Sequence, residues 1–165
     1  ERVGLRRPGS AQFVYPYDVK VLPAGKRTAK IYVSLWGDGS IAVVDPAAKN
    51  RVSHITVGRH PTAMIFNKAK SRLIVVNSDA DSVSVIDTTT FTSRVLPIRA
   101  MDRASGVAAT ADGHHALVAH AQALGHGPGT LAGGKGQGDC ELLATKPAHE
   151  ILPAQATGGQ AHEVA

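Results

Sequence analysis

A glycine-rich stretch near residue 130 has the residue types of a phosphate-binding loop. Gly129, Gly134 and Lys135 have the spacing of that motif, in which backbone amides and a lysine hold phosphate groups. The next residue is Gly136, where the motif requires a Ser or Thr hydroxyl for Mg²⁺. No pattern of a strand leading into a helix surrounds the stretch. We therefore interpret it as glycine-rich coil, and the sequence predicts neither nucleotide binding nor any other cofactor.

A second group of residues has the chemistry of metal ligands. It consists of His114, His115, His120 and His126, followed by Cys140 and His149. Imidazole and thiolate bind zinc well, but structural zinc sites use short fixed spacings such as Cys-x2-Cys. The spacings here do not match, and adjacent residues such as His114 and His115 point to opposite sides of a strand. We predict no metal site.

Most of the chain is built from a repeated unit. The segment from Ile31 to Pro61 recurs from Leu73 to Ala100 at an offset of 42 residues. A period of about 40 residues is typical of propellers and solenoids built from one supersecondary unit. Each copy has short runs of Val, Ile and Thr separated by turn residues, which predicts strands. The expected strands are 17–22, 30–35, 40–45 and 51–57 in the first copy, and 62–66, 72–77, 82–87 and 92–98 in the second.

A repeated unit of four antiparallel strands matches a propeller blade. The residue pattern of this repeat also matches a known repeat motif. The chain resembles the YVTN-type β-propeller repeat of bacterial YncE-like proteins, most closely the propellers found beside an alkaline-phosphatase-like phosphoesterase domain. The matching segments are 15–19, 31–38, 43–45, 57–61 and 83–87. The resemblance implies an exported protein, periplasmic or secreted, with about seven or eight blades. No phosphoesterase motif lies in these 165 residues, so that activity is not carried over.

The sequence divides into a leading segment (1–13), repeats (14–120) and a tail (121–165). The repeats comprise a blade over 14–60, a blade over 61–103 and a partial blade over 104–120. The tail has nine Gly, nine Ala and three Pro in 45 residues, which predicts irregular, disordered chain with a turn of helix over 141–145. The fold class expected is all-β, an incomplete β-propeller with an irregular tail.

Fewer than three blades cannot close a propeller. We therefore expect a piece of a longer protein, and a small domain of stacked sheets is the alternative. The loss of the repeat after His120 is also compatible with a change of reading frame in the tail.

Charge and cysteine content restrict the partners only loosely. Lys and Arg outnumber acids by seven to two in residues 1–30, whereas acids outnumber them by five to two after residue 104. The basic residues of the segment 1–30 can bind phosphate groups. Aromatic residues are not interleaved with them, so nucleic-acid binding is not predicted. Cys140 is the only cysteine, which excludes an internal disulfide. No signal peptide or membrane-spanning segment is evident in the sequence.

Two kinds of polar or aromatic residue interrupt the strands. Asp45 and Asp87 occupy the same place in the two copies, where a carboxylate can accept hydrogen bonds from the amides of the following turn. A pair repeated once per blade is unsuited to acid–base catalysis. Residues that do not repeat are better candidates for ligand contact. We select four in the loops between strands: Trp36, Asp38, His60 and Asp79.

The sequence therefore predicts a non-catalytic binding module or scaffold, with a protein or polyanionic ligand and the remaining blades of a parent propeller as partners. No catalytic residue is assigned. The alternative is the propeller portion of a hydrolase, phosphoesterase-linked or lactonase-like, whose catalytic residues lie outside this chain.

Overall fold

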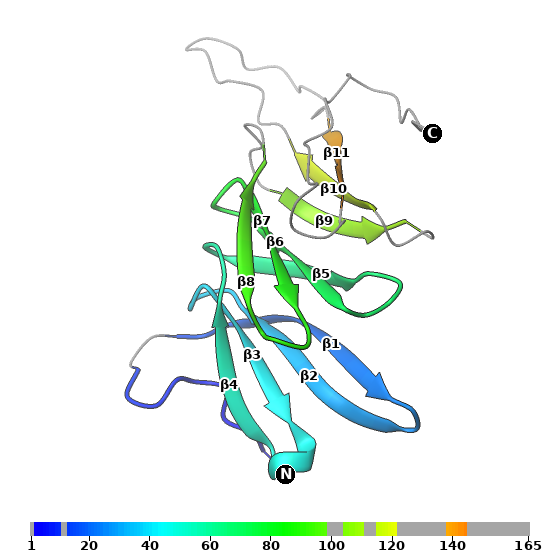
Figure 1. Ribbon diagram of the computed structural model, residues 1–165. Helices are drawn as coiled ribbons and strands as arrows, with labels where there is room; N and C mark the ends of the chain where they lie inside the picture. The colour runs from blue at the N-terminus through cyan, green and yellow to red at the C-terminus, as the bar shows by residue number, and fades with distance from the viewer. Residues whose placement is uncertain (1, 11–12, 99–103, 111–114, 122–137, 145–165) are drawn as a thin grey trace.

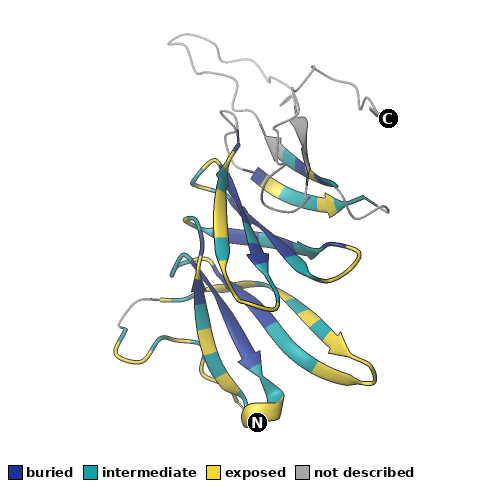
Figure 2. Cartoon of the chain, viewed as in Figure 1, coloured by how far each residue is buried: buried dark blue, intermediate teal, exposed yellow. Residues whose placement is uncertain are grey.

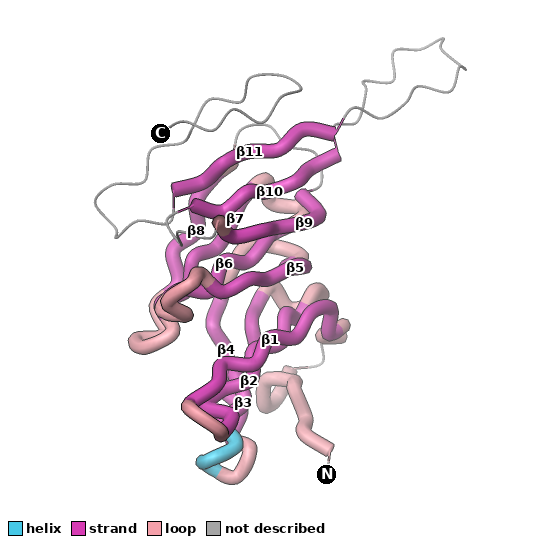
Figure 3. Tube along the Cα trace, turned by 90° about the vertical axis from the view of Figure 1, so that its right-hand side faces the viewer, coloured by secondary structure: helices cyan, strands magenta, loops and turns pink. Residues whose placement is uncertain are grey.

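The strands form three antiparallel sheets stacked one upon the next (Figures 1 and 3). The structure is a computed structural model and describes residues 2–10, 13–98, 104–110, 115–121 and 138–144. The strand orders are β1-β2-β3-β4, β5-β6-β7-β8 and β11-β10-β9. In the first two sheets each strand pairs with its neighbour in sequence, as in the blades of a propeller. The predicted fold class, all-β with incomplete propeller blades, is confirmed.

The strand boundaries repeat as the sequence predicts. The first sheet has β1 (Pro16–Ala24), β2 (Arg27–Leu35), β3 (Ser40–Asp45) and β4 (Arg51–Thr56). The second has β5 (Pro61–Phe66), β6 (Arg72–Asn77), β7 (Ser82–Asp87) and β8 (Ser93–Pro97). The third has β9 (Ala104–Ala109), β10 (His115–Ala121) and β11 (Gly138–Ala144). Thus β3 and β7 differ by 42 residues at both ends, and β5 and β9 differ by 43.

The predicted role of the two repeated aspartates is confirmed. Asp45 Oδ1 accepts hydrogen bonds from the amides of Ala47 and Ala48 at 3.1 and 3.3 Å, within a 3-10 turn at Pro46–Ala48. Asp87 Oδ1 does the same for the amides of the second and third residues after it. Each aspartate also pairs with a cation on the preceding strand, Lys30 in one copy and Arg72 in the other. These contacts fix the turn that leads into the outermost strand of each blade.

A shared apolar core joins the first two blades. The first blade contributes Tyr32, Ile41, Val43, Ile55 and Val57, and the second contributes Met64, Leu73, Val75 and Ile86. Figure 2 shows that the buried positions lie along the middle of both sheets. Tyr32 is fully buried, and its ring meets Phe66 edge-on with centroids 5.6 Å apart. Because side chains alternate across a strand, Tyr32 faces this core while Ile31 and Val33 face the other way.

The outer faces of this pair of blades are covered differently. In the second blade, Ile74 and Val76 pack against Ala116 and Val118 of the third sheet. In the first blade, the face that points away from the second blade packs against Leu5 of the leading segment and against Val14, which follows it. His54 Nε2 lies 2.8 Å from the carbonyl oxygen of Leu5. The leading segment therefore forms part of the packing of the first blade.

A buried polar link crosses between the innermost strands. The amide of Met64 on β5 donates to Asp18 Oδ2 on β1 at 2.8 Å, and the amide of Asp18 donates to Ser34 Oγ at 2.9 Å. Lys20 balances the carboxylate with an ion pair at 3.1 Å. A charge-assisted bond to an amide is stronger than a neutral one, so Asp18 fixes β5 against β1.

The third sheet contains a strand that the sequence does not predict. We expect irregular chain with a turn of helix at 141–145, but β11 pairs with β10 from Gly138 to Ala144, with His115 opposite Ala144. The helical expectation is wrong. The open edge of β10 offers a row of unpaired amides and carbonyls, and pairing with that edge outweighs the weak strand propensity of the segment. The rest of the tail lies outside the described residues.

Tyr32 provides a test of the core between the blades. Its hydroxyl is buried with no hydrogen-bond partner among the described residues, and burial, aided by the charge of Asp87, raises its pKa to about 12. An unpaired buried hydroxyl costs free energy, so we expect Tyr32→Phe to increase the free energy of unfolding by about 1 kcal/mol at neutral pH. In the wild type the unfolded tyrosine ionises near pH 10.0 and the folded one near 12, so stability should fall as the pH rises between these values.

Urea unfolding at neutral pH and across that alkaline range measures both effects. Tyr17→Phe is the matched control, because Tyr17 is 63% exposed. Tyr32→Phe should lose the alkaline decline that Tyr17→Phe retains. Equal declines in the two variants would show that Tyr32 is not buried in this core.

Candidate ligand-binding site

One end of the blades gathers the loops that carry the predicted ligand residues. At this end β2 leads into β3, β4 leads into β5 and β6 leads into β7, and β1 begins here (Figure 1, left side). We call it the aromatic end and define it by Phe13, Tyr15, Tyr17, Trp36 and His60. The opposite end carries the hairpins that join β1 to β2, β3 to β4, β5 to β6 and β7 to β8.

Three of the four predicted loop residues form a connected row across the two blades. The imidazole of His60 stacks on the indole of Trp36, with ring centroids 3.9 Å apart and an interplanar angle of 10°. His60 Nδ1 lies 2.5 Å from Asp79 Oδ2. Arg59, beside them, donates weakly to the carbonyl oxygen of Asp79 at 3.4 Å. The row thus joins the first blade, the connection between blades and the second blade.

The row borders an open apolar hollow of about 280 Å³. Tyr15, Pro16, Tyr17 and Trp36 line it. The edge of the Tyr15 ring meets Trp36 at a centroid distance of 6.1 Å. Tyr15 and Tyr17 are 58% and 63% exposed. Exposed rings with a few polar groups beside them are the usual composition of a ligand pocket.

Two further aromatic contacts extend this surface. The ring of Phe13 lies 5.9 Å from that of Tyr15, and the guanidinium of Arg6 lies over Phe13 at 5.6 Å from its centroid. Phe13 is 66% exposed. A cation over the face of an aromatic ring is attracted by the ring quadrupole. The leading segment therefore adds Phe13 and Arg6 to the exposed aromatic surface.

Backbone hydrogen bonds hold residues 14 and 15, which follow the leading segment, against the loop after β2. The amide of Trp36 donates to the Tyr15 carbonyl at 2.9 Å, and the amide of Gly37 donates to the Val14 carbonyl at 3.2 Å. Tyr15 and His60 have positive φ values of 37° and 50°, a region that residues with a side chain rarely adopt. Lys49, Asn50, Lys70 and Phe91 also have positive φ values, so this conformation is not confined to the aromatic end.

Asp38, the fourth predicted residue, lies apart from this row and fastens the leading segment. Its side chain is only 6% exposed. Arg7 Nε donates to Asp38 Oδ2 at 3.0 Å, and Ser40 Oγ donates to the same oxygen. Burial acts to raise the pKa of Asp38, but these hydrogen bonds and the Arg7 charge hold it below the usual 3.8.

The other candidate groups do not join the aromatic end. Asp45 and Asp87 lie at the opposite end of the blades, where the Lys30 hydrogen bond lowers the pKa of the first and the Thr90 and Thr89 amides lower that of the second. His115, His120 and Cys140 lie in β10 and β11. The remaining histidines of that group and the glycine-rich stretch with Lys135 lie outside the described residues. Within the described part of the chain, no three metal-ligating side chains cluster.

Sequence reasoning misses Tyr15, Tyr17 and Phe13 as part of the site. Phe13 precedes the repeats, and Tyr15 and Tyr17 correspond in the second copy to His60 and Thr62, neither of which is a tyrosine, so the repeat pattern does not single them out. The available signal is the density of aromatic residues, since Phe13, Tyr15 and Tyr17 are three of the seven Phe, Trp and Tyr residues in the chain.

Comparison with solved structures supports the architecture. Kuenenia stuttgartiensis hydrazine synthase matches 93% of this chain at 20% identity with a TM-score of 0.63. A Bacteroides uniformis protein described as a candidate 6-phosphogluconolactonase matches 90% at 9% identity with a TM-score of 0.65. A Desulfotomaculum acetoxidans protein of unknown function matches 87% at 10% identity with a TM-score of 0.62. At these identities the likeness concerns the propeller-like fold alone.

This chain spans about two fifths of those structures, namely 40%, 43% and 42% of their lengths. No protein-family description matches the sequence. No curated protein matches it either. Over the described residues, no helix has the length and apolar character needed to cross a membrane.

Gly37 tests how the leading segment is attached. A Cβ at this position would lie 2.2 Å from the Phe13 carbonyl oxygen and 3.0 Å from the Tyr15 ring, so Gly37→Ala must displace the segment. Losing its two backbone hydrogen bonds should reduce the free energy of unfolding by about 1–3 kcal/mol. Urea unfolding followed by Trp36 fluorescence measures this, because Trp36 is the only tryptophan. Gly4→Ala is the control, since a Cβ there meets nothing within 4 Å; equal stability of the two variants would contradict the attachment.

The lowered pKa of Asp38 predicts that the stability of the fold decreases at acidic pH. Because its pKa is lower in the folded protein than the usual 3.8, its contribution is present above that pH and disappears as the pH falls below it. We expect Asp38→Asn to be less stable than the wild type at pH 7 and equally stable near pH 2. Arg7→Gln should flatten the same acid limb in part. Melting temperatures measured from pH 7 to about 2 check this; a constant gap between wild type and Asp38→Asn would show that the carboxylate charge is not involved.

Proposed function

We propose that this chain is a non-catalytic binding module of the β-propeller type and that its ligand binds at the aromatic end. The carrying observation is the continuous surface of Tyr15, Tyr17, Trp36, His60 and Asp79 beside an open apolar hollow. Exposed aromatic patches on a soluble protein are costly and usually mark interaction sites.

Two contacts fix the orientation of the His60 imidazole. In His60, Nδ1 faces Asp79 and one ring face is covered by Trp36. The hydrogen-bond contact with Asp79 and the stack on Trp36 together fix the orientation of the ring, which suits a residue that positions Trp36 and presents an edge to a ligand.

The lining of the hollow favours a protein segment rich in proline or other apolar side chains. Extended proline-rich segments dock into grooves lined by aromatic rings, because their conformation is already ordered before binding. Tyr15, Tyr17 and Trp36 provide three such rings. Asp79, whose side chain is 45% exposed, and the exposed Arg59 provide polar contacts at the border for the backbone of the segment.

We further propose that the repeats are of the YVTN type and that the chain acts within a longer exported protein. The repeated residue pattern of positions 14–120 supports this proposal. The alternative, the propeller portion of a phosphoesterase-linked or lactonase-like hydrolase, has less support. The likeness to the candidate 6-phosphogluconolactonase is at 9% identity and concerns the fold.

A fluorescence titration tests the proposed site. Trp36, the only tryptophan, reports on the site directly. A proline-rich decapeptide should give a saturable change in its emission, and Tyr15→Ala should weaken the affinity roughly tenfold, as expected for loss of an aromatic anchor. Phe91→Ala is the matched control, because Phe91 is an exposed aromatic residue at the opposite end.

The outcomes separate the function from the ligand class. Saturation by the peptide, with loss in Tyr15→Ala and none in Phe91→Ala, supports the proposal. Saturation by a neutral oligosaccharide such as cellohexaose alone would keep the binding site and overturn the protein ligand. An unchanged emission with both probes, or equal effects of the two substitutions, would overturn the site.

A further inference from the structure

The end opposite the aromatic end concentrates positive charge. It consists of the hairpins that join β1 to β2, β3 to β4, β5 to β6 and β7 to β8, and we call it the basic end. Its cations are Lys26, Arg27, Lys30, Lys49, Arg51, Lys68, Lys70 and Arg72. Its acids are Asp45 and Asp87. Among the described residues of these hairpins, cations therefore outnumber acids by eight to two.

Both acids of the basic end, Asp45 and Asp87, already pair with a cation. Lys30 Nζ lies 2.8 Å from Asp45 Oδ2, and Arg72 pairs with Asp87. Each carboxylate also accepts two amide hydrogen bonds from its own turn. The other six cations of the basic end are all exposed: Lys26, Arg27, Lys49, Arg51, Lys68 and Lys70. Among the described residues of the basic end, no acid therefore remains to pair with these six cations.

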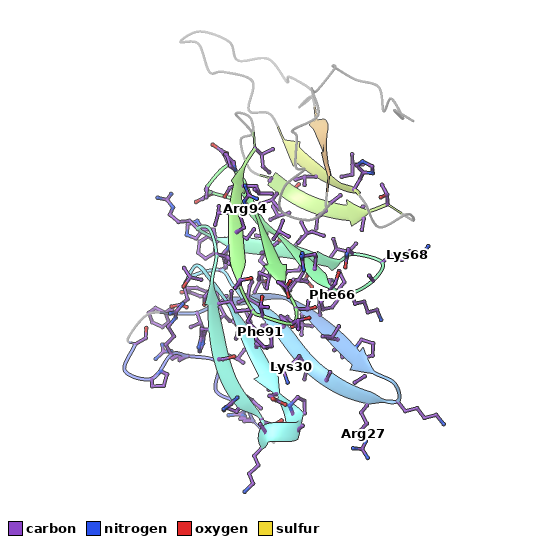
Figure 4. The ribbon with its side chains drawn as sticks, viewed as in Figure 1. Arg27, Lys30, Phe66, Lys68, Phe91 and Arg94 are labelled. Atoms are coloured by element: carbon purple, nitrogen blue, oxygen red, sulfur yellow. The ribbon has the colours of Figure 1, made fainter. Side chains whose placement is uncertain are left out.

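The charge is spread across two blades in corresponding places. Figure 4 shows Arg27 and Lys68 projecting outward from the hairpins between the first and second strands of successive blades. Lys26 and Lys70 lie in the same two hairpins. An anion that contacts both hairpins must therefore extend from one blade to the next.

We propose that the basic end binds a linear acidic polysaccharide whose carboxylates lie along an extended chain. Long, exposed lysine side chains act as separate point charges, so they suit a polymer with many charges better than a single phosphate, which needs converging donors. Their combined field also attracts such a polymer from a distance.

The aromatic content of the basic end separates this ligand from other polyanions. Single-stranded nucleic acids bind where bases stack on aromatic rings, and stable membrane attachment usually combines basic residues with apolar side chains that enter the lipid. Phe91 is the exposed aromatic residue of the described hairpins, and Phe66 is half-buried against Tyr32. The tips that carry the cations are otherwise made of Gly, Ala, Pro, Asn and Ser. A polymer recognised by charge fits this surface better than one recognised by stacking or insertion.

This second surface does not depend on the proposed function, because it lies at the other end of the sheets and uses different residues. Trp36→Ala should leave polysaccharide binding unchanged. Loss of peptide binding and loss of polysaccharide binding are therefore distinguishable.

Calorimetric titration of the full chain with long-chain oligogalacturonate at low salt tests the proposal. Its methyl-esterified form, which has the same sugars without the charges, is the ligand control. Lys68→Gln with Lys70→Gln should weaken binding roughly tenfold, since each exposed charge contact contributes modestly. Arg2→Gln with Arg59→Gln removes the same net charge away from the basic end and should change the affinity less than about twofold.

Saturable, salt-sensitive binding of oligogalacturonate that depends on Lys68 and Lys70, with no binding of the ester, supports the proposal. Equal losses of affinity in the two double variants would show that binding depends on net charge and not on the position of the lysines, and this result would overturn the site. Tighter binding of single-stranded DNA with the same number of charges, or of anionic phospholipid vesicles, would overturn the polysaccharide as the ligand. A flat titration at low salt would overturn the basic end as a binding surface.

Discussion

The packing of the first blade against the second is the interaction on which the remaining structure depends. Each of the two sheets needs a neighbouring sheet to cover both of its faces. A single sheet of this size buries too little apolar surface to be stable alone. Tyr32 and Phe66 meet at this interface, and Asp18 fastens the two innermost strands beside it. Because the interface sets the spacing of the blades, it also sets the distance between the loops at each end.

The two ends of the blades carry different types of residue. At the aromatic end the loops differ from one copy to the next, so Trp36 in the first copy has Ser78 as its counterpart in the second. At the basic end the turns are alike, with Asp45 and Asp87 each bonded to a turn and to a cation. Repetition therefore builds the paired aspartate turns of the basic end, whereas departure from repetition builds a local pocket.

The sequence predicts the repeated features well, because each depends on local patterning. The strands β3, β6 and β7 have the predicted bounds, and the aspartate turns form as expected. Contacts made once cannot be found by comparing copies. The leading segment covers the first blade and brings Tyr15 beside Trp36, and Asp38 turns toward Arg7 because that segment lies there. Strand β11 forms through pairing with the edge of β10, which depends on tertiary context.

The central claim is that two blades together build one surface, and the stack of Trp36 on His60 is its most direct signature. Proton NMR of the free protein can measure it through the ring protons of His60. The account predicts nuclear Overhauser contacts between these protons and the indole of Trp36, with upfield shifts that disappear in Trp36→Leu. Imidazole protons at random-coil shifts, with no contact to the indole, would contradict it.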